Sequence, residues 1–544
     1  MNMKLILLFM FVQASLGYIN FEKYLWKTWK NGSFYAFRGI KYAESPTGLL
    51  RFKSPRPSKT WNNISAIFEQ LRNEDGSDCP SPNVSYDENC LNLNVYTKKL
   101  DIVNLMPVIV FIHPGGFYVG SGSSANFGPE YLLEEDLVLV TFNYRLAFFG
   151  FTSVGSNEAI GNAGFKDQAL VLKWVHNHIR HFGGDPNSVT LMGDSAGGMS
   201  VQAHIVSPLS HNLFHRAFIM SGGILPQAKS PSSQPHLIEK LARFLNCPEN
   251  ENSFECVKKT ETAPITDSLR KIFEFGWDNP VYPWLPIVES PSDEEPFLSE
   301  DPMQLFEDGK FNKIPVMISS TKDETSMSAM YLFEHRNLLS EWVNDFSRVG
   351  PICMQYEPNE TVTDQLKERY VPYKIDDKEH VVDLFDWCAQ SFSDSTIIFP
   401  FHRMAQIVRD ATDVFYMKFN FRGQYTSFKC NSTIDKQLCE ELSAKNMIEH
   451  CDDLQYLFTA ANIPRIKDES SAEGQIVTKY TKLLHSFAKN GYPYFGLEIP
   501  ANSVKFDDDE KFVEFDTKFT INNHPFRNSD IWDSLFPRQN KHKK

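Results

Sequence analysis

Short apolar runs alternate with longer amphipathic segments along most of the chain. Residues 107–112 and 137–142 are almost uninterrupted apolar runs, a pattern typical of parallel strands that are buried on both faces. Weaker signals of the same two kinds continue downstream. The strand candidates are residues 189–192, 217–220, 315–319 and 414–419. The helix candidates are residues 164–182, a segment that begins after residue 195, residues 478–489 and a segment near the C-terminus. This alternation predicts an α/β fold with a large, mostly parallel central sheet flanked by helices.

Nothing in the pattern divides the chain into several domains. The 544 residues contain no internal repeat, no low-complexity tract and no long Pro- or Ser-rich linker. Chain length alone is a weak guide to domain number. We therefore expect residues 18–544 to form one α/β domain with loop and helix insertions.

The N-terminal residues 1–17 have the pattern of a signal peptide. One lysine precedes a short apolar run, and a Ser-Leu-Gly sequence supplies small residues near a cleavage site. The run is too short to span a bilayer, and no later segment is long and apolar enough to do so. We expect a secreted, extracellular protein without integral membrane association.

The cysteines and the glycosylation sequons agree with this compartment. Nine cysteines are present, and three pairs are close enough in sequence to close small disulfide loops: Cys79/Cys90, Cys247/Cys256 and Cys430/Cys439. Cys353, Cys388 and Cys451 remain. No Cys or His spacing matches a zinc site, so we expect no metal. Sequons that permit N-glycosylation occur at Asn31, Asn63, Asn83, Asn359 and Asn431.

The charge balance limits the classes of partner. Hydrophobic residues make up 42% of the chain and charged residues 22%, as in an ordinary globular protein. The formal net charge of −14 argues against nucleic acid or an anionic membrane as the main partner. It favours solubility and says little about the substrate.

A Gly-x-Ser-x-Gly motif marks a candidate nucleophile. It spans residues 193–197 with Ser195 at its centre, between a predicted strand and a predicted helix. A serine at such a sharp turn projects its hydroxyl into a site near a helix N-terminus, where backbone N–H groups favour negative charge. The motif alone is weakly specific, and the alternative is an ordinary glycine turn.

A second glycine pair provides candidate donors for an oxyanion hole. Gly115 and Gly116 follow the predicted strand at residues 107–112. Acyl transfer places negative charge on a carbonyl oxygen, and backbone N–H groups aimed at that oxygen stabilise it. Pro114 has no N–H to donate, so we expect Gly115, Gly116 and Ala196 to be the donors.

Taken in order, the motifs resemble those of the type-B carboxylesterase/lipase family, the cholinesterase-like α/β-hydrolases, and in particular insect carboxylesterases. The likeness covers nearly the whole mature chain. The matching segments are residues 37–40, 50–52, 88–96, 143–146, 161–168 and 182–186, followed by the serine motif and Ser207-Pro208. The α/β-hydrolase fold places its triad in the order serine, acid, histidine.

The resemblance implies the rest of a catalytic triad. Family members carry the acid in an Asp-Glu-Gly segment after a strand. The matching segment is Asp323-Glu324-Thr325, which makes Glu324 the expected acid and Asp323 the fallback. Thr325 replaces the usual glycine.

His450, which precedes an acidic and aromatic stretch, is the expected base. The implied reaction is hydrolysis of a small carboxylic ester through an acyl-enzyme, without a cofactor.

The resemblance also implies structural pairs. Cys79–Cys90 and Cys247–Cys256 match family disulfides, whereas Cys430–Cys439 and Cys353–Cys388 follow only from counting, which leaves Cys451 as the free thiol. Two ion pairs are expected in addition, Arg51 with Glu88 and Arg145 with Asp167.

Other functions remain open at this point. A catalytically inactive binding or adhesion protein would share the fold, but all three triad positions are filled here. A cholinesterase needs an aromatic cage for its cationic substrate, and residues 80–89, which form the loop between Cys79 and Cys90, contain no tryptophan. A specialised juvenile hormone esterase usually has glutamine before the serine, where this chain has Asp194. A lipase would share the serine motif but less of the flanking sequence.

Overall fold

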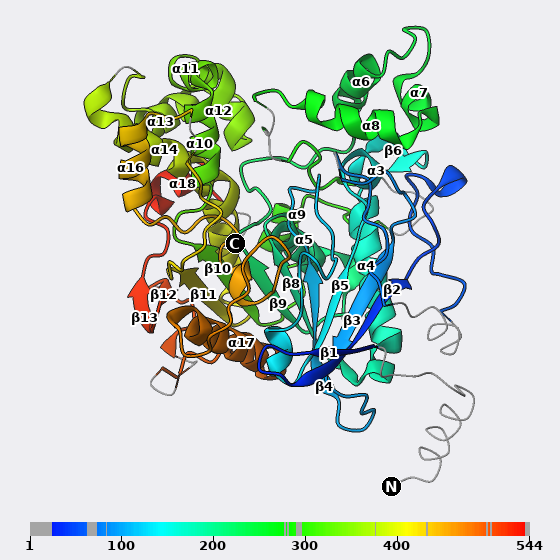
Figure 1. Ribbon diagram of the computed structural model, residues 1–544. Coiled ribbons are helices and arrows are strands. Elements are labelled where there is room, and N and C mark those ends of the chain that lie inside the picture. Colours follow the sequence, from blue (N-terminus) through cyan, green and yellow to red (C-terminus); the bar gives the residue numbers. More distant parts are fainter. Residues whose placement is uncertain are drawn as a thin grey trace.

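One twisted sheet of eleven strands runs through the computed structural model (Figure 1). The structure describes residues 24–61, 73–82, 84–276, 279, 282–289, 296–375, 377–430, 433–496, 499–500 and 503–538. The expected signal peptide at residues 1–17 lies outside these residues. In spatial order the strands are β1 (Leu25–Lys27), β2 (Ser33–Lys41), β3 (Asn92–Thr97), β5 (Val138–Phe142), β4 (Met106–Ile112), β8 (Gly184–Asp194), β9 (Arg216–Met220), β10 (Val316–Thr321), β11 (Val414–Phe419), β12 (Lys511–Phe515) and β13 (Phe519–Asn523).

The middle of this sheet is parallel and its two margins are antiparallel. Every pairing from β5 across to β12 is parallel, whereas β1 to β3, the β3–β5 pair and the β12–β13 pair are antiparallel. A small separate hairpin is formed by β6 (Ser153–Ser156) and β7 (Ala159–Ile160). The expected mostly parallel α/β sheet is confirmed.

Helices follow the strands and cover both faces of the sheet. They are α3 (Ala147–Phe151), α4 (Ala163–His178), α5 (Ala196–Val206), α6 (Pro235–Phe244), α7 (Ser253–Lys259), α8 (Thr262–Ser268), α9 (Pro302–Glu307), α10 (Ser326–Glu334), α11 (Arg336–Asn344), α12 (Phe346–Met354), α13 (Glu360–Tyr370), α14 (Val381–Ser393), α15 (Phe399–Val408), α16 (Lys436–Ala444), α17 (Ala472–Asn490) and α18 (Ser529–Leu535). Helices α6 to α8 and α10 to α13 form two groups at the top of Figure 1, at the opposite end from α17.

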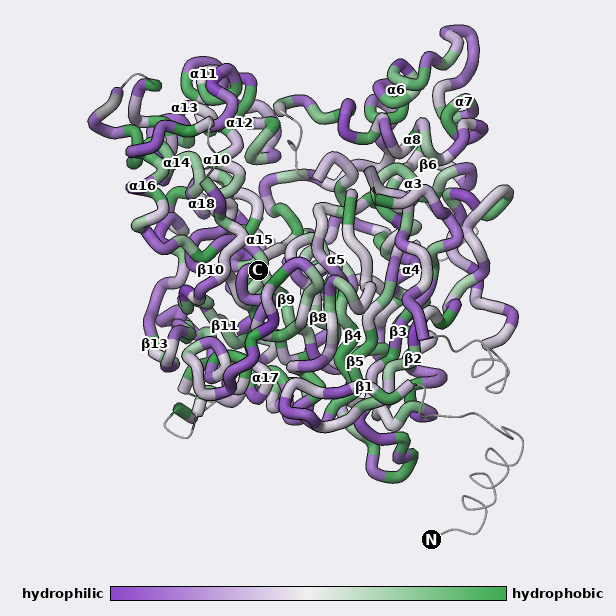
Figure 2. Tube along the Cα trace, in the orientation of Figure 1, coloured by the Kyte–Doolittle hydropathy of each residue, from purple (hydrophilic) through white to green (hydrophobic). Residues whose placement is uncertain are grey.

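The strands bury apolar side chains on both faces. Along β4, Val108 and Val110 belong to one core group, and Ile109 and Phe111 belong to the other, because successive side chains of a strand point to opposite faces. Helix α17 packs against β4 and β8 on the second face, and α5 packs against β8 and β9. Figure 2 shows apolar residues concentrated along the central strands and polar residues along the outer helices.

Two sequence-based boundaries differ from the structure. Strand β8 begins at Gly184, well before the expected residue 189, because Gly184 pairs with Met106 across an irregularity in the β4–β8 ladder. The predicted helix at residues 164–182 ends as α4 at His178 and continues as a 3-10 turn to Phe182. None of the helices in the described ranges is both long and apolar enough to cross a membrane.

All nine cysteines lie in the described ranges, and six of them form the disulfides Cys79–Cys90, Cys247–Cys256 and Cys430–Cys439. The pairing of Cys353 with Cys388 that follows from counting is wrong, because both are free thiols buried in the core. Cys353 lies in α12 and Cys388 in α14, where each packs as a small apolar side chain. Cys451 is also a free thiol.

Candidate active site

Ser195 lies at a sharp turn between strand β8 and helix α5. Its backbone has φ 56° and ψ −120°, a conformation that is costly for a residue with a side chain. Its N–H donates to the carbonyl of Met220 at 2.8 Å, which ties the turn to the end of β9. The surrounding sheet therefore holds the serine in a strained geometry at the N-terminus of a buried helix.

The motif's glycines permit unusually close backbone contacts. A Cβ on Gly193 would lie 2.3 Å from the carbonyl oxygen of Gly197, and a Cβ on Gly197 would lie 2.2 Å from that of Ile112. These distances are far below normal van der Waals contact. Side chains at either position would push α5 away from β4 and β8, and Ser195 would move with the helix.

Glu324 lies just after β10, and both of its carboxylate oxygens are hydrogen-bonded. Oε1 accepts from the N–H of Thr321 at 2.8 Å and from the hydroxyl of Ser221 at 2.5 Å. Oε2 lies 2.6 Å from Nδ1 of His450. Burial raises the pKa of Glu324, but His450 and these hydrogen bonds outweigh burial, and its net pKa is lowered. The side chain is therefore a buried carboxylate that stays ionised.

Thr325 adopts the turn that the usual glycine would make. Its φ is 60° and its ψ is 18°, within the left-handed region. The Thr325 hydroxyl donates to the carbonyl of Ala389 in α14 at 3.0 Å. This contact with a neighbouring helix helps to hold a conformation that costs a threonine energy.

His450 is oriented by Glu324, and its pKa reflects this contact. Burial lowers the pKa of the imidazole, whereas Cys451 and Glu324 raise it, and the net pKa lies well above 6.5. Burial raises the pKa of the Cys451 thiol as well, so this group keeps its proton at neutral pH. Glu324 is therefore the group whose charge acts on His450 under those conditions.

Asp323, the fallback acid, has a different position. Its carboxylate accepts from the N–H of Ile448 at 3.0 Å, and its own N–H donates to the Ile448 carbonyl at 3.0 Å. It also lies 3.6 Å from the ammonium group of Lys322. Asp323 thus anchors the segment that carries His450, whereas Glu324 contacts the imidazole itself.

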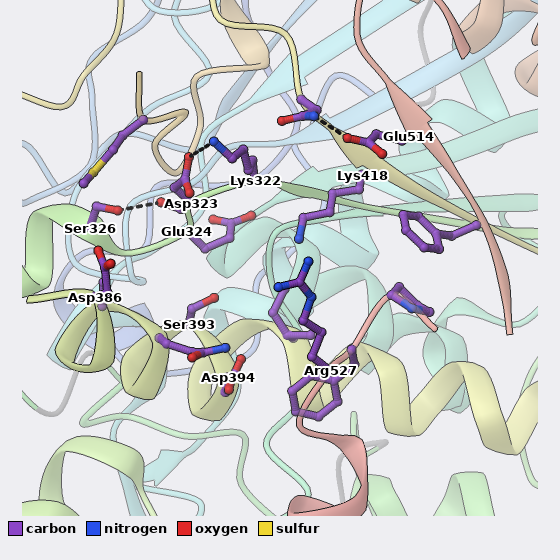
Figure 3. Close-up of a pocket in the computed structure, with 18 of the residues that line it drawn as sticks. Lys322, Asp323, Glu324, Ser326, Asp386, Ser393, Asp394, Lys418, Glu514 and Arg527 are labelled. Atoms are coloured by element: carbon purple, nitrogen blue, oxygen red, sulfur yellow. Dashed lines mark hydrogen bonds and ion pairs between the residues drawn. The ribbon is translucent and has the colours of Figure 1, made fainter. Parts of the chain in front are cut away.

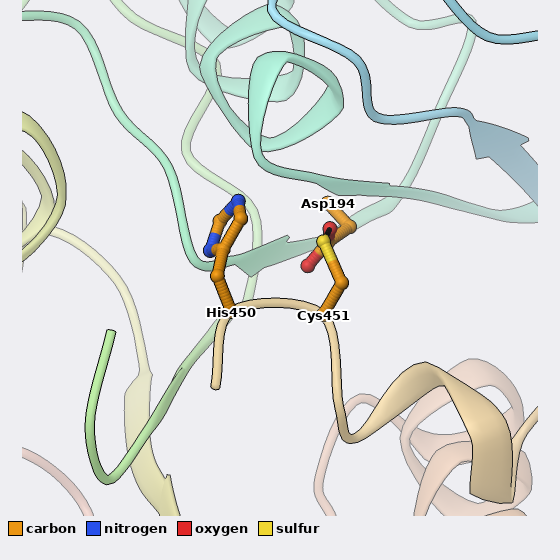
Figure 4. Close-up of side chains that lie close together, drawn as sticks. All are labelled: Asp194, His450 and Cys451. Atoms are coloured by element: carbon orange, nitrogen blue, oxygen red, sulfur yellow. Dashed lines mark hydrogen bonds between the residues drawn. The ribbon is translucent and has the colours of Figure 1, made fainter. Parts of the chain in front are cut away.

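Several contacts connect the segments that carry Ser195 and His450. Asp194, directly before the serine, accepts a hydrogen bond from the thiol of Cys451, directly after the histidine, at 2.8 Å (Figure 4). The buried hydroxyl of Tyr282 is hydrogen-bonded to Ser195 and interacts electrostatically with His450 and Glu324. Burial raises the pKa of Tyr282 to about 12, so its hydroxyl stays protonated.

The glycine pair after β4 is shaped as an amide donor site. Gly115 has φ 125°, and a Cβ there would lie 2.0 Å from the carbonyl oxygen of Val119. Among the described residues, no acceptor is found for the N–H of Gly115, Gly116 or Ala196. These three groups can therefore donate to a bound molecule.

Sequence reasoning did not identify two residues at this site. Ser221 holds Glu324, and its position directly after the apolar strand β9 is a signal that could have indicated it. Tyr282 contacts Ser195 from a segment far along the chain. No local pattern distinguishes it from the other 19 tyrosines of this sequence.

One cavity adjoins the acid rather than the serine. It has a volume of about 870 Å³ and is lined by Glu324 together with charged side chains such as Lys418 and Arg527, which point toward one another (Figure 3). Neither Ser195 nor His450 lines it. The cavity therefore adjoins Glu324 without reaching Ser195 or His450.

One group of side chains has donor atoms suited to a metal ion. The ligand atoms of Asp194, His450 and Cys451 lie within 4.8 Å of one another. Burial is the main cause that raises the pKa of Asp194 to about 6. Sequence spacing did not reveal this group, because one of its members is more than 250 positions away from the other two.

Two of the predicted glycosylation sites can be placed. Asn31 and Asn359 are exposed, and Asn359 caps α13 by accepting from the N–H of Val362 at 3.1 Å. The other three sites, Asn63, Asn83 and Asn431, lie outside the described residues.

The two expected ion pairs are present: Arg51 binds Glu88, and Arg145 contacts Asp167 at 2.6 Å.

Comparisons with known proteins show the family of this chain and its fold. The carboxylesterase family model matches residues 11–531. Juvenile hormone esterase of Tribolium castaneum is 32% identical over 90% of this chain and 86% of its own, and esterase E4 of Myzus persicae is 35% identical over 73% of each. The crystal structure of juvenile hormone esterase from Manduca sexta, with OTFP covalently attached, superposes with a TM-score of 0.77 at 24% identity, covering 94% of this chain and 97% of the other.

The family match spans most of the chain, and the solved structure shares its fold. The predicted α/β-hydrolase architecture is confirmed by this likeness. The chain belongs to the carboxylesterase family and is a hydrolase of carboxylic esters.

Proposed function

We propose that this esterase hydrolyses small carboxylic esters with Ser195 as nucleophile, His450 as general base and Glu324 as the acid that orients the base. His450 accepts the proton of Ser195 as the serine attacks the ester carbonyl. Glu324 holds the imidazole through Nδ1 and stabilises the imidazolium that forms. The alcohol then leaves, and His450 activates a water molecule that hydrolyses the acyl-enzyme.

Backbone amides complete the proposed reaction site. The N–H groups of Gly115, Gly116 and Ala196 are the proposed donors to the oxyanion. Their lack of acceptors within the described part of the chain supports this role, because an N–H that is already bonded could not bind the developing charge. A single donor of this kind contributes about 3 kcal/mol to stabilising the transition state.

The observation that carries the proposal is the contact between Glu324 and His450. The 2.6 Å distance joins residues 126 positions apart, and the residue that follows His450 contacts the residue that precedes Ser195 at 2.8 Å. A binding protein without catalysis would need neither a buried ionised carboxylate on the imidazole nor three amides that have no acceptor among the residues described.

The test is the hydrolysis of p-nitrophenyl esters by the purified chain and by its Ser195→Ala variant. We expect turnover to fall about a million-fold in the variant. Reaction with a fluorophosphonate probe provides a second readout, because only an activated serine is labelled. Normal turnover by Ser195→Ala would refute the proposal. A wild-type chain that neither hydrolyses esters nor reacts with the probe would favour a catalytically inactive binding protein.

We further propose that the protein is secreted and that residues 18–544 form one domain. Three disulfides support an oxidising compartment, and the single sheet takes strands from β1 to β13. The exposed Asn31 and Asn359 are suited to carry N-glycans. Appearance of the protein in culture medium, at a mass that falls on treatment with an N-glycosidase, would agree with this; retention in the cytosol would contradict it.

Juvenile hormone is a second candidate for the natural substrate. The 32% identity to the Tribolium castaneum juvenile hormone esterase favours it. Asp194, at a position where those enzymes usually have glutamine, weighs against it. Comparing kcat/KM for juvenile hormone with values for short p-nitrophenyl esters and acetylthiocholine distinguishes the substrates.

A further inference from the structure

Three side chains at the proposed catalytic site, one of them the proposed base His450, form a compact group with mixed chemistry. Asp194 supplies a carboxylate, His450 an imidazole and Cys451 a thiol, with ligand atoms within 4.8 Å of one another. We propose that these side chains bind a zinc-class divalent cation and that the bound ion inhibits the esterase reversibly. Figure 4 shows the thiol and the carboxylate facing each other beside the imidazole ring.

The carboxylate of Asp194 lacks the hydrogen bonds that a buried charge normally receives. The residue has no exposed surface. Its Oδ1 has no partner among the described residues, and its Oδ2 accepts only from the Cys451 thiol, which is a weak donor. Buried carboxylates are usually met by several N–H or O–H groups, as Glu324 is in this protein. A cation would supply the missing interaction.

A second buried carboxyl group lies close enough to interact with Asp194. Asp453 is fully buried and interacts electrostatically with Asp194. Its Oδ1 also has no hydrogen-bond partner within the described part of the chain. Burial and the neighbouring Asp194 raise the pKa of Asp453 well above its usual value, so the proposed site rests on the carboxylate of Asp194 and not on Asp453. His450 and Cys451 are both partly exposed, which gives an ion access to the group.

The donor set selects the type of cation. Zinc binds sulfur at about 2.3 Å and nitrogen or oxygen at about 2.0–2.2 Å in a tetrahedral arrangement. The ligand atoms around such an ion lie about 3–4 Å apart, so a spacing within 4.8 Å needs only small movements. Cadmium, with similar ligand preferences, is a suitable probe, whereas magnesium and calcium prefer oxygen ligands alone. On binding, the thiol releases its proton to solvent and a sulfur–metal bond forms, without oxidation.

Metal binding would stop the proposed reaction through either ring nitrogen of His450. An ion on Nε2 occupies the lone pair that accepts the Ser195 proton. An ion on Nδ1 displaces Glu324 from its 2.6 Å contact. Loss of activity in both cases rests on the proposed function, but binding itself does not.

A cadmium titration tests binding without activity. Cd²⁺ is added to the full chain carrying Ser195→Ala, which retains all three ligands, and the ultraviolet thiolate-to-cadmium absorption band is recorded. We expect the band to saturate at about one equivalent per chain, as expected for a single site. In the same background, Cys451→Ser should lose the band, because the hydroxyl can still bond to Asp194 but the sulfur is gone.

The variant has an internal control and a clear contrary outcome. Cys353 and Cys388 are free thiols that remain in Cys451→Ser. An equal band in both proteins would overturn the proposal, because cadmium would then bind elsewhere. Absence of any band in the chain that retains Cys451 would overturn it as well.

Inhibition by Zn²⁺ tests the functional consequence. We expect zinc to inhibit p-nitrophenyl ester hydrolysis, EDTA to restore it, and the half-inhibitory concentration to rise at least about tenfold in Cys451→Ser. Equal zinc sensitivity of the two proteins, or a loss that EDTA does not reverse, would contradict the proposed site. If the wild-type chain hydrolyses no ester, the proposed function fails while the cadmium titration still tests the metal site.

Discussion

The three proposed catalytic side chains are each held in place by different forces. Backbone strain and the hydrogen bond to Met220 position Ser195. Hydrogen bonds from Thr321 and Ser221 position Glu324, and Glu324 in turn positions His450. Each of these restraints involves a residue from a different strand or loop, so a single substitution can disturb one role and leave the others intact.

Glu324→Gln should lower kcat by about 10⁴-fold if the carboxylate orients His450 and stabilises its cation, as the acid does in other triads. Asp323→Asn is the matched control, because this adjacent carboxylate anchors Ile448 and does not contact the imidazole. We expect its kcat to change less than about tenfold. Steady-state hydrolysis of p-nitrophenyl acetate measures both variants, and a larger loss in Asp323→Asn would reverse the assignment.

The pH dependence of kcat/KM should report the raised pKa of His450. Only neutral imidazole can accept the serine proton, so the rate is lost as pH falls through this pKa and rises above it. Because Glu324 raises the pKa, we expect a midpoint above 6.5 in the wild type and a lower midpoint for the residual activity of Glu324→Gln. A midpoint that does not move between the two proteins would contradict this origin of the shift.

At the scale of elements, the site depends on how closely α5 approaches the sheet. Gly193 and Gly197 let the backbone of this helix approach β4 and β8 far more closely than any side chain would permit. Because Ser195 precedes α5 directly, its position follows that of the helix. The amide of Ala196, at the first position of the helix, follows it as well.

Gly197→Ala should disturb this packing. The added methyl would lie 2.2 Å from the Ile112 carbonyl oxygen, and such overpacking costs about 1–3 kcal/mol. We expect a lower urea midpoint and reduced turnover. Gly309→Ala is the control: Gly309 has φ 71° with no atom near an added Cβ, so it should lose about 1 kcal/mol of stability and keep its turnover. Unchanged turnover in Gly197→Ala would argue against the dependence on close packing.

At the scale of the whole molecule, a buried ion pair joins segments from distant parts of the chain. Arg145 follows β5 and contacts Asp167 in α4 at 2.6 Å, and its guanidinium also donates to the carbonyl of Lys53 at 2.8 Å. The two side chains are 3% and 0% exposed. Neither charge can be hydrated if its partner is removed.

Asp167→Ala should therefore lower the free energy of unfolding by about 3–5 kcal/mol, because it leaves Arg145 buried and unpaired. Lys436→Ala serves as the comparison. It breaks an exposed pair with Glu440, in which the lysine side chain is 91% exposed, and should change stability by less than about 1 kcal/mol. Urea unfolding followed by tryptophan fluorescence measures both, and similar effects would contradict the role given to burial.

Local patterns were sufficient to predict much of the fold. The apolar runs predicted β4 and β5 to within a residue because strands buried on both faces need continuous apolar sequence. The start of β8 was missed because residues 184–188 are polar and pair only through an irregular ladder. The disulfide between Cys353 and Cys388 was predicted wrongly, because counting cysteines carries no information about the distance between α12 and α14.

The sequence by itself indicated the order along the chain of the central strands β4, β5 and β8 to β11 and the position of the Gly193–Gly197 turn, because these depend on interactions between residues close along the chain. Only the tertiary structure decided which of Asp323 and Glu324 faces His450, that Tyr282 contacts Ser195, and that Cys451 donates to Asp194. These contacts join residues 87 to 257 positions apart, and the packing of the whole sheet brings them together.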